Sequence, residues 1–388
     1  MEKVDSALDR RTLGPSLGIE WAILEIVTRG ESLTAQAEAV ESAIAKASVD
    51  HDTLLGLAVR HNLVPALASV LKHTSLFDRF AASERKHLLR THDFTRARNA
   101  ELTNEALRLA DVLTAAGLKF AFTKGVVVQF MAYDGDGTRP MSDIDLMVDP
   151  ACAGDVQGEL FKLGYAVAIH DHVSGALKPL TRERQLHYVL SPDHLPHVVR
   201  LNSNPVCPAF AVDCAMSFTW ANCEWQVDLS PALGSLIPIQ AGEMDATISG
   251  PQLQTLLPSL DYGNTWLFTV LHLFREAWVH RTAMEYHPTL GQFRDVARLW
   301  ARYSGAIAPL VAKILEEDDV AFPVAWVCMH TDALLGTNIA GSLNVSSLLS
   351  PNDLNTVLGA DGKLLYWAGS IRERMRRGEA VQCFPVPQ

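Results

Sequence analysis

The sequence predicts a mixed α/β core placed between two mainly helical regions. Apolar residues recur at helical spacing as far as Ala116, strand-like alternation begins at Leu118, and helical spacing returns after Pro258. The chain shows no internal repeat and no low-complexity linker long enough to separate independent domains. The expected division is an N-terminal helical region over residues 1–110, a core over 111–235 and a mainly helical C-terminal region over 236–388.

Two amphipathic stretches predict the helices of the first region. His51–His73 carries leucine and alanine at helical spacing, and Pro65 within it is expected to kink the helix or to divide it into two short ones. Asp93–Ala116 has one apolar stripe and predicts a longer helix. Gly117 follows at the position where glycine commonly ends a helix, so a strand is expected to begin directly after it.

The expected core begins after Gly117, where the spacing of apolar residues changes from helical to strand-like. Lys124-Gly125 marks a turn, and the alternation of side chains along a strand would place Asp143 and Asp145 on one face of the sheet. Asp149-Pro150 is a typical helix start, because an acidic cap is followed by proline in the first turn. The expected elements here are a strand over Leu118–Thr123, a short helix over Val126–Tyr133, a strand over Asp143–Val148, a helix from Pro150 to Leu163 and a strand over Tyr165–Ile169.

Periodicity in the second half of the chain predicts more strands and then helices. Between Gln185 and Leu229 four short segments alternate as strands do, and after Pro258 the apolar spacing is helical. The expected strands are Leu186–Leu190, His197–Leu201, Ala209–Ala215 and Trp225–Leu229, and the clearest expected helices are Trp266–Trp278, Leu290–Tyr303 and Ile307–Leu315.

Composition and charge narrow the classes of function. Of the 388 residues, 48% are hydrophobic and 20% are charged, the balance of a globular protein. No apolar run approaches the roughly 20 residues that cross a bilayer, and the first residues lack the apolar segment of a secretory signal. The net charge of −11 disfavours a nucleic-acid partner, because phosphate backbones are bound by basic surfaces. The six scattered cysteines favour neither disulfides nor a zinc site, so we expect a cytoplasmic protein.

The segment from Lys124 to Val148 has the pattern of a metal and phosphate site. Asp143 and Asp145 stand at i and i+2 of one expected strand, so their carboxylates would project side by side. Mg²⁺ takes oxygen ligands and is typically held by one or two carboxylates together with substrate phosphates. The turn at Gly125 opens a helix, and free N–H groups at a helix start attract phosphate. The combination favours a nucleoside triphosphate site, whereas the acid pair alone would fit a solvated strand end equally well.

The order of these residues resembles the nucleotidyltransferase superfamily of the DNA polymerase β type. It is similar in particular to a bacterial group of uncharacterised nucleotidyltransferases with a Lys-Gly turn, a short helix and an Arg-Pro-x-Ser-Asp-x-Asp-Leu strand, here Lys124-Gly125 and Arg139–Leu146. The resemblance extends loosely over residues 51–300 and includes Leu271–Phe274 and Arg294–Ala297 in its C-terminal helices. It implies a nucleotidyltransferase core with a mixed sheet, flanked by N- and C-terminal helical regions.

The resemblance also implies roles for individual residues. Asp143 and Asp145 would bind Mg²⁺, with two ions expected and Mn²⁺ able to replace them. A third catalytic and metal-binding acid would lie on a later strand, at Asp213 or at Asp228, and we favour Asp213 because the strand that contains it is better defined. The residues expected to contact the triphosphate are Lys124, Gly125, Arg139 and Ser142.

Two departures from the pattern of this group concern the glycine turn and the third acid. The turn supplies no hydroxyl, because Val126 follows Lys124-Gly125, and neither candidate for the third acid is followed by histidine. Lys124 would supply a positive charge to the phosphates in place of the hydroxyl. Arg139 has two interpretations, since it can contact phosphate or pair with a nearby carboxylate.

The implied reaction is attack by an acceptor oxygen on the α-phosphorus of a nucleoside triphosphate, with release of pyrophosphate. The acidic net charge favours a hydroxyl on a small molecule, a peptide or a protein as acceptor over a polynucleotide. Two alternatives stay open. One is a catalytically degenerate relative that binds a nucleotide or a partner protein in the same cleft, and the other is a toxin-like nucleotidyltransferase that modifies transfer RNA, which a basic groove would support.

Overall fold

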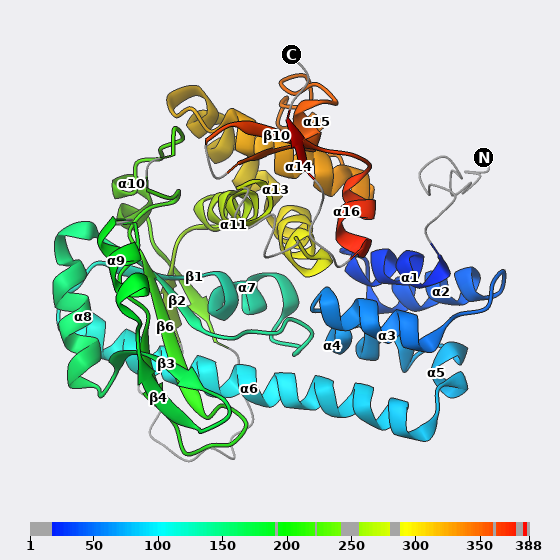
Figure 1. The fold of residues 1–388 in the computed structure, drawn as a ribbon, viewed down its shortest axis with the longest axis horizontal. Helices are drawn as coiled ribbons and strands as arrows, with labels where there is room; N and C mark the ends of the chain where they lie inside the picture. Colours follow the sequence, from blue (N-terminus) through cyan, green and yellow to red (C-terminus); the bar gives the residue numbers. More distant parts are fainter. Residues whose placement is uncertain are drawn as a thin grey trace.

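The structure of the chain is a computed structural model, and it describes residues 18–190, 193–221, 223–241, 256–279, 288–359, 362–377 and 383–385. An eight-stranded mixed sheet lies beside the N-terminal helices, and the C-terminal helices lie across one side of both (Figure 1). This arrangement confirms the predicted α/β class with flanking helical regions. None of the helices among the described residues is long and apolar enough to cross a membrane.

Six helices precede the sheet within the described part of the chain. Pro65 lies in the first turn of α4 and separates it from α3, so of the two outcomes expected for this proline the structure shows the division into two short helices. The long helix α6 starts earlier than expected, and the Glu84 carboxylate caps it by accepting the backbone N–H of Ala81 at 2.6 Å. The helices are α1 (Ile19–Thr28), α2 (Leu33–Ile44), α3 (His51–Arg60), α4 (Val64–Leu71), α5 (Ser75–Arg79) and α6 (Ala82–Ala115).

The sheet has the strand order β4-β3-β5-β6-β2-β1-β8-β7. Its centre is mainly apolar, and every residue of β1 and β2 is buried, including the polar Thr123 and Asp145. β2 pairs with β1 in antiparallel and with β6 in parallel orientation. The strands are β1 (Phe120–Thr123), β2 (Ile144–Val148), β3 (Ala166–Asp171), β4 (Ala176–Pro179), β5 (Val198–Leu201), β6 (Ala209–Ala215), β7 (Ile237–Gln240) and β8 (Leu256–Ser259).

Short helices connect these strands. The segment after β1 is helix α7 (Lys124–Tyr133), and Gly117, with φ +69°, ends α6 as predicted. Asp149 caps the helical segment after β2 through a bond from the N–H of Ala151 at 2.9 Å. The remaining connections are η1 (Pro150–Cys152), α8 (Ala153–Lys162), α9 (Arg182–Leu190) and α10 (Ser230–Gly234).

Two of the expected strands are wrong. Leu186–Leu190 is the second half of helix α9, which begins where the Thr181 hydroxyl accepts the N–H of Arg184 at 3.4 Å. Its apolar residues alternate in sequence but also fit helical spacing, and the periodicity was ambiguous for so short a run. Trp225–Leu229 is not a strand either, because Trp225 packs into an aromatic cluster against Trp278 at 5.3 Å between ring centroids.

The C-terminal region is mainly helical, as predicted. The expected helices Leu290–Tyr303 and Ile307–Leu315 form one helix, α13, which bends at Tyr303, where φ is −129°. The helices are α11 (Tyr262–Trp278), α13 (Leu290–Glu317), α14 (Ala321–Leu335), α15 (Ile339–Ser342), η2 (Asp353–Asn355) and α16 (Ile371–Arg377), and a small sheet contains β9 (Thr356–Leu358), β10 (Leu364–Trp367) and β11 (Cys383–Pro385).

Candidate active site

The turn between β1 and α7 places two of the predicted residues at the end of the central strands. Lys124 adopts φ +45°, so the chain reverses within one residue from strand to helix. Gly125 follows it in a crowded position. A Cβ atom there would lie 3.2 Å from Met141 Sδ and 3.3 Å from Arg139 Nη1. Glycine therefore allows the segment before β2 to approach the turn closely.

Strand pairing brings two of the predicted acids together. Asp145 on β2 is in register with Asp213 on β6, and because these strands are parallel their side chains at this level project from the same face of the sheet. Asp143 lies just before β2, and the Ser142 hydroxyl donates to its Oδ1 at 2.9 Å. The structure thus gathers Asp143, Asp145 and Asp213 at one end of the sheet.

Asp228 does not join this group. It lies before α10, where its Oδ1 accepts the backbone N–H of Ser230 at 2.9 Å. Of the two candidates for the third acid, only Asp213 is on a strand beside β2.

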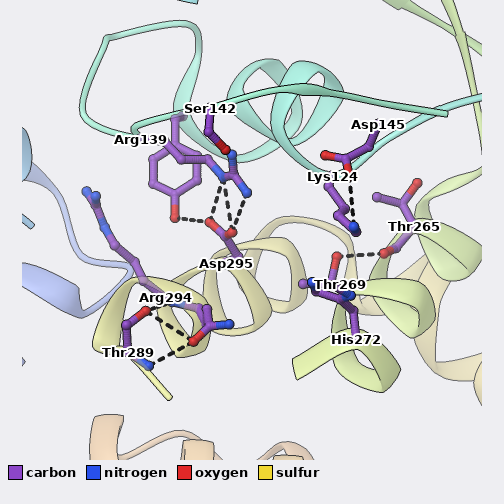
Figure 2. A network of polar contacts seen from close by, with 12 residues as sticks. Lys124, Arg139, Ser142, Asp145, Thr265, Thr269, His272, Thr289, Arg294 and Asp295 are labelled. Carbon is purple, nitrogen blue, oxygen red and sulfur yellow. Dashed lines mark hydrogen bonds and ion pairs between the residues drawn. The ribbon is translucent and has the colours of Figure 1, made fainter. Parts of the chain in front are cut away.

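The ammonium group of Lys124 lies among these acids. Its Nζ donates to Asp145 Oδ1 at 2.8 Å (Figure 2), and both side chains are largely buried. Burial opposes the charged form of Lys124, but Asp145 and Asp213 outweigh it and raise the pKa of the amine above its usual value. Lys124 is therefore firmly protonated and neutralises part of the negative charge.

The other two acids differ in their ionisation. Burial, together with the nearby charge of Asp145, raises the pKa of Asp143 to about 6. Burial acts in the same direction on Asp213, but His197 and Lys124 hold the pKa of this carboxyl well below its usual value. The partner His197 lies just before β5 with its Nε2 3.1 Å from Asp213 Oδ1, and that carboxylate raises the pKa of the imidazole against the effect of burial. Neither candidate acid is followed by a histidine in the sequence, but His197, next to the neighbouring strand β5, takes that place beside Asp213.

The chemistry of these side chains suits a hard divalent cation. Carboxylate oxygens are the ligands that Mg²⁺ takes, and the buried Oδ1 of Asp213 accepts no hydrogen bond of regular geometry from the described residues. Within the described ranges, however, no three His, Cys, Asp or Glu side chains stand close enough together to hold a metal ion. The Lys124 ammonium already binds one oxygen of Asp145, so a metal ion would compete with it for that oxygen.

A cleft of about 260 Å³ opens between the turn and helices α11 and α13. Its lining contains Lys124, Gly125, Arg139, Ser142, Asp143 and Asp145 from the predicted set, whereas Asp213, on the strand next to Asp145, is not part of the lining. The opposite wall contains residues that the sequence analysis did not assign to the site, namely Thr269, His272 and Glu276 of α11 and Gln292 and Asp295 of α13.

Arg139 pairs with a carboxylate that is distant in sequence. Its Nε donates to both oxygens of Asp295 at 3.0 Å and its Nη2 donates to Oδ2 at 2.8 Å (Figure 2). Tyr133 adds a third donor, with its hydroxyl 2.6 Å from Asp295 Oδ1. The sequence allowed Arg139 either to contact phosphate or to pair with a nearby carboxylate, and the structure shows the pair with a carboxylate. The Nη1 group is not engaged by Asp295 and faces the Gly125 turn, so its two N–H groups are available to a phosphate in the cleft.

Comparison with known proteins gives one finding. Residues 47–336, about three quarters of the chain, match the model of a family described as "Uncharacterised nucleotidyltransferase". The matched range contains the turn, the three acids, their histidine partner and the cleft-lining residues of α11 and α13. No curated protein matches the chain.

Proposed function

Since the chain belongs to this family of uncharacterised nucleotidyltransferases, we propose that it transfers a nucleoside monophosphate from a nucleoside triphosphate to an oxygen acceptor, with Mg²⁺ as cofactor. The observation that carries the proposal is the pairing of Asp145 with Asp213 on adjacent parallel strands, beside a glycine turn that opens a helix. Two acids and a phosphate-binding turn at one edge of a sheet are what this transfer requires.

In the proposed reaction an oxygen of the acceptor forms a bond to the α-phosphorus, and the bond from that phosphorus to the oxygen that bridges the α- and β-phosphates breaks, so that pyrophosphate leaves with this oxygen. The proton of the acceptor hydroxyl passes to the Asp213 carboxylate, which the pair with His197 keeps ionised. Mg²⁺ would be held by Asp143, Asp145 and Asp213 once Lys124 has left Asp145 and the three carboxylates have moved closer together, and it would supply charge neutralisation at the phosphates. The remaining catalysis consists of positioning the two reactants.

The cationic side chains have separate tasks in this proposal. Lys124, now paired with Asp145, exchanges that carboxylate for a phosphate oxygen when the donor binds. Arg139 remains held by Asp295 and presents its Nη1 group to the phosphates beside Gly125. Ser142 keeps the Asp143 carboxylate oriented through its hydroxyl.

The charge of the cleft favours a small molecule, a peptide or a protein hydroxyl as the acceptor. Four acidic and two basic side chains line it, namely Asp143, Asp145, Glu276 and Asp295 against Lys124 and Arg139. A polynucleotide would bring its phosphate backbone to an acidic surface, which argues against transfer RNA as acceptor. One observation favours the catalytically degenerate alternative, which is that Lys124 already satisfies Asp145.

Calorimetric titration with each of the four ribonucleoside triphosphates in the presence of Mg²⁺ tests the proposal. We expect one of the four triphosphates to bind the wild-type protein in a metal-dependent manner. The double variant Asp143→Asn/Asp145→Asn should no longer bind it. Asp171→Asn is the matched control, because it removes an acid of the same sheet that pairs with Lys178 at 2.6 Å in the β3–β4 hairpin. Absence of binding to the wild type with either Mg²⁺ or Mn²⁺ would contradict the proposed enzyme.

A further inference from the structure

A second cavity adjoins the cleft at the start of helix α13. Its volume is about 100 Å³, and its lining shares Arg139, Pro140, Gln292 and Asp295 with the larger cleft. The charge of its lining is of the opposite sign, with the two arginines Arg139 and Arg294 against the single acid Asp295. A cleft that is acidic and a neighbouring pocket that is basic would select different ligand groups.

Arg294 is the unusual member of this pocket. Only 4% of the residue is exposed, yet its guanidinium has no carboxylate partner among the described residues. Nη1 and Nη2 donate to the carbonyl and the hydroxyl of Thr138 at 3.3 and 3.4 Å, and Nε has no partner within the described chain. A buried charge without a counter-ion is costly, so a structural role alone is a weak explanation for it.

The surrounding acids neutralise this cation only in part, because none of them forms an ion pair with it within the described residues. The adjacent Asp295 is already engaged by Arg139 and by the hydroxyl of Tyr133. The guanidinium groups of Arg294 and Arg298 each lie 4.7 Å from the centroid of the Tyr133 ring. Burial lowers the pKa of Arg294 and the charge of Arg298 acts in the same direction, and together they outweigh the opposing effects of Tyr133, Asp136 and Asp295.

The helix itself adds to the attraction for an anion. The pocket includes Thr289, Gly291 and Gln292 at the beginning of a 28-residue helix, whose dipole is positive at this end. The N–H groups of Gly291 and Gln292 are already bonded, to His61 and to Thr289. The dipole therefore supports the site, while Arg294 is the group with unused donor capacity.

We propose that this pocket is a phosphate subsite, in which Arg294 and Arg139 bind a phosphate group of a ligand that extends into the cleft. The ligand chemistry is the same for two sources, the terminal phosphates of the donor or a phosphate carried by the acceptor. Only the interpretation of the ligand as a substrate rests on the proposed nucleotidyl transfer. The site itself does not.

The first experiment measures binding of inorganic phosphate and of inorganic pyrophosphate by calorimetry at low salt, with a chelator present so that no metal bridges the anion to the acids. We expect binding to the wild type and a loss of roughly tenfold or more in affinity for Arg294→Gln, a loss equivalent to one charge-assisted contact. The matched control is Arg298→Gln, because Arg298 contacts the same Tyr133 ring but does not line the pocket. No binding to the wild type, or equal binding to both variants, would overturn the proposal.

Thermal unfolding of the same variants separates a binding role from a structural one. Replacement of a buried, unpaired charge is expected to leave the midpoint of Arg294→Gln unchanged or raised, whereas a structural arginine would lower it on removal. A lowered midpoint combined with unchanged phosphate affinity would assign Arg294 to the core and contradict the subsite. Arg294→Lys retains the charge, and we expect it to recover part of the phosphate affinity.

Competition identifies the source of the phosphate. If a non-hydrolysable triphosphate with Mg²⁺ displaces pyrophosphate, the pocket takes the terminal phosphates of the donor. If both bind together, the pocket belongs to a phosphorylated acceptor. Failure of every triphosphate to bind would refute the proposed nucleotidyl transfer, but phosphate binding that depends on Arg294 would still establish the subsite.

Discussion

Two ion pairs join helix α13 to the chain around α7, and they differ in their surroundings. Arg139–Asp295 is at the cleft, where the side chains are 17% and 10% exposed. Arg302–Asp134 is at the surface, where they are 36% and 73% exposed, although Arg302 also donates to two oxygens of its acid. The two pairs therefore share their chemistry and the elements that they connect, and burial is the main difference between them.

The comparison shows that the same contact has different consequences at different depths. At the surface, water replaces either partner, so the pair contributes little to stability. At the cleft, Asp295 accepts from Arg139 and from Tyr133, and removal of the acid leaves both donors buried without a partner. The buried pair is also the one that orients a cation toward the Gly125 turn, so we expect stability and the proposed phosphate binding to depend on it together.

The largest expected effect is the loss of stability in Asp295→Ala. Removal of one member of a buried ion pair typically costs about 3–5 kcal/mol, and the free energy of unfolding from chemical denaturation should fall by that amount. The control is Asp134→Ala, which removes the acid of the surface pair. If Asp295→Ala lowers the free energy of unfolding by no more than Asp134→Ala does, burial does not explain a difference in stability between the two ion pairs.

Tyr133→Phe tests how much the third donor contributes. The variant keeps the ring between Arg294 and Arg298 but removes the 2.6 Å bond to Asp295. A hydrogen bond to a charged group contributes about 1.5–3 kcal/mol, and we expect a loss of stability in that range by chemical denaturation. Tyr303→Phe provides the comparison, because its hydroxyl donates to the uncharged carbonyl of Met131 at 3.0 Å instead of to a carboxylate.

Asp295→Asn tests the functional side of the comparison. Asparagine retains the shape but loses the charge that fixes Arg139, so we expect the Kd for the bound triphosphate to rise about tenfold, a change of about 1.4 kcal/mol. Calorimetry with Mg²⁺ is the measurement, and Arg139→Gln should show at least the same loss. If Asp295→Asn binds the triphosphate as tightly as the wild type, Asp295 has no part in presenting Arg139.

The smallest effect is expected for Arg302→Gln. This variant breaks the surface pair between the same two elements, and exposed ion pairs contribute about 0–1 kcal/mol. We expect a change in unfolding free energy within that range and unchanged affinity for the triphosphate. A loss of several kcal/mol in unfolding free energy would mean that an ion pair between α13 and the chain around α7 stabilises the protein whether or not it is buried.

The periodicity of apolar residues predicted most of the individual strands and helices of the core. Strand β6 has the expected bounds Ala209–Ala215, and α7 follows the Lys124-Gly125 turn. The acids of β2 were placed on one face because side chains alternate along a strand, and strand pairing then brings Asp213 to Asp145. Helix α9 was misassigned because Leu186–Leu190 is too short to distinguish the two periods.

The wall opposite the acids could not be predicted in this way. Asp295 meets Arg139 across 156 residues of chain, and no periodicity encodes which helix packs over which turn. His197 was missed for the same reason, since it reaches Asp213 from a strand that pairs with β6. The resemblance did mark the segments that contain His272 and Asp295, which was a signal that they belong near the site.

The backbone of Lys124 has a consequence for how this protein can change under selection. A residue other than glycine pays roughly 1–2 kcal/mol to adopt a left-handed conformation such as φ +45°. Glycine at this position would relieve that cost and discard the ammonium group. The loss of the ammonium would leave Asp145 buried without its partner, and removal of one member of a buried ion pair typically costs about 3–5 kcal/mol, more than the relieved strain. A library of variants screened for thermal tolerance alone should therefore retain lysine at position 124, because the ion pair at the turn outweighs the strain of its backbone.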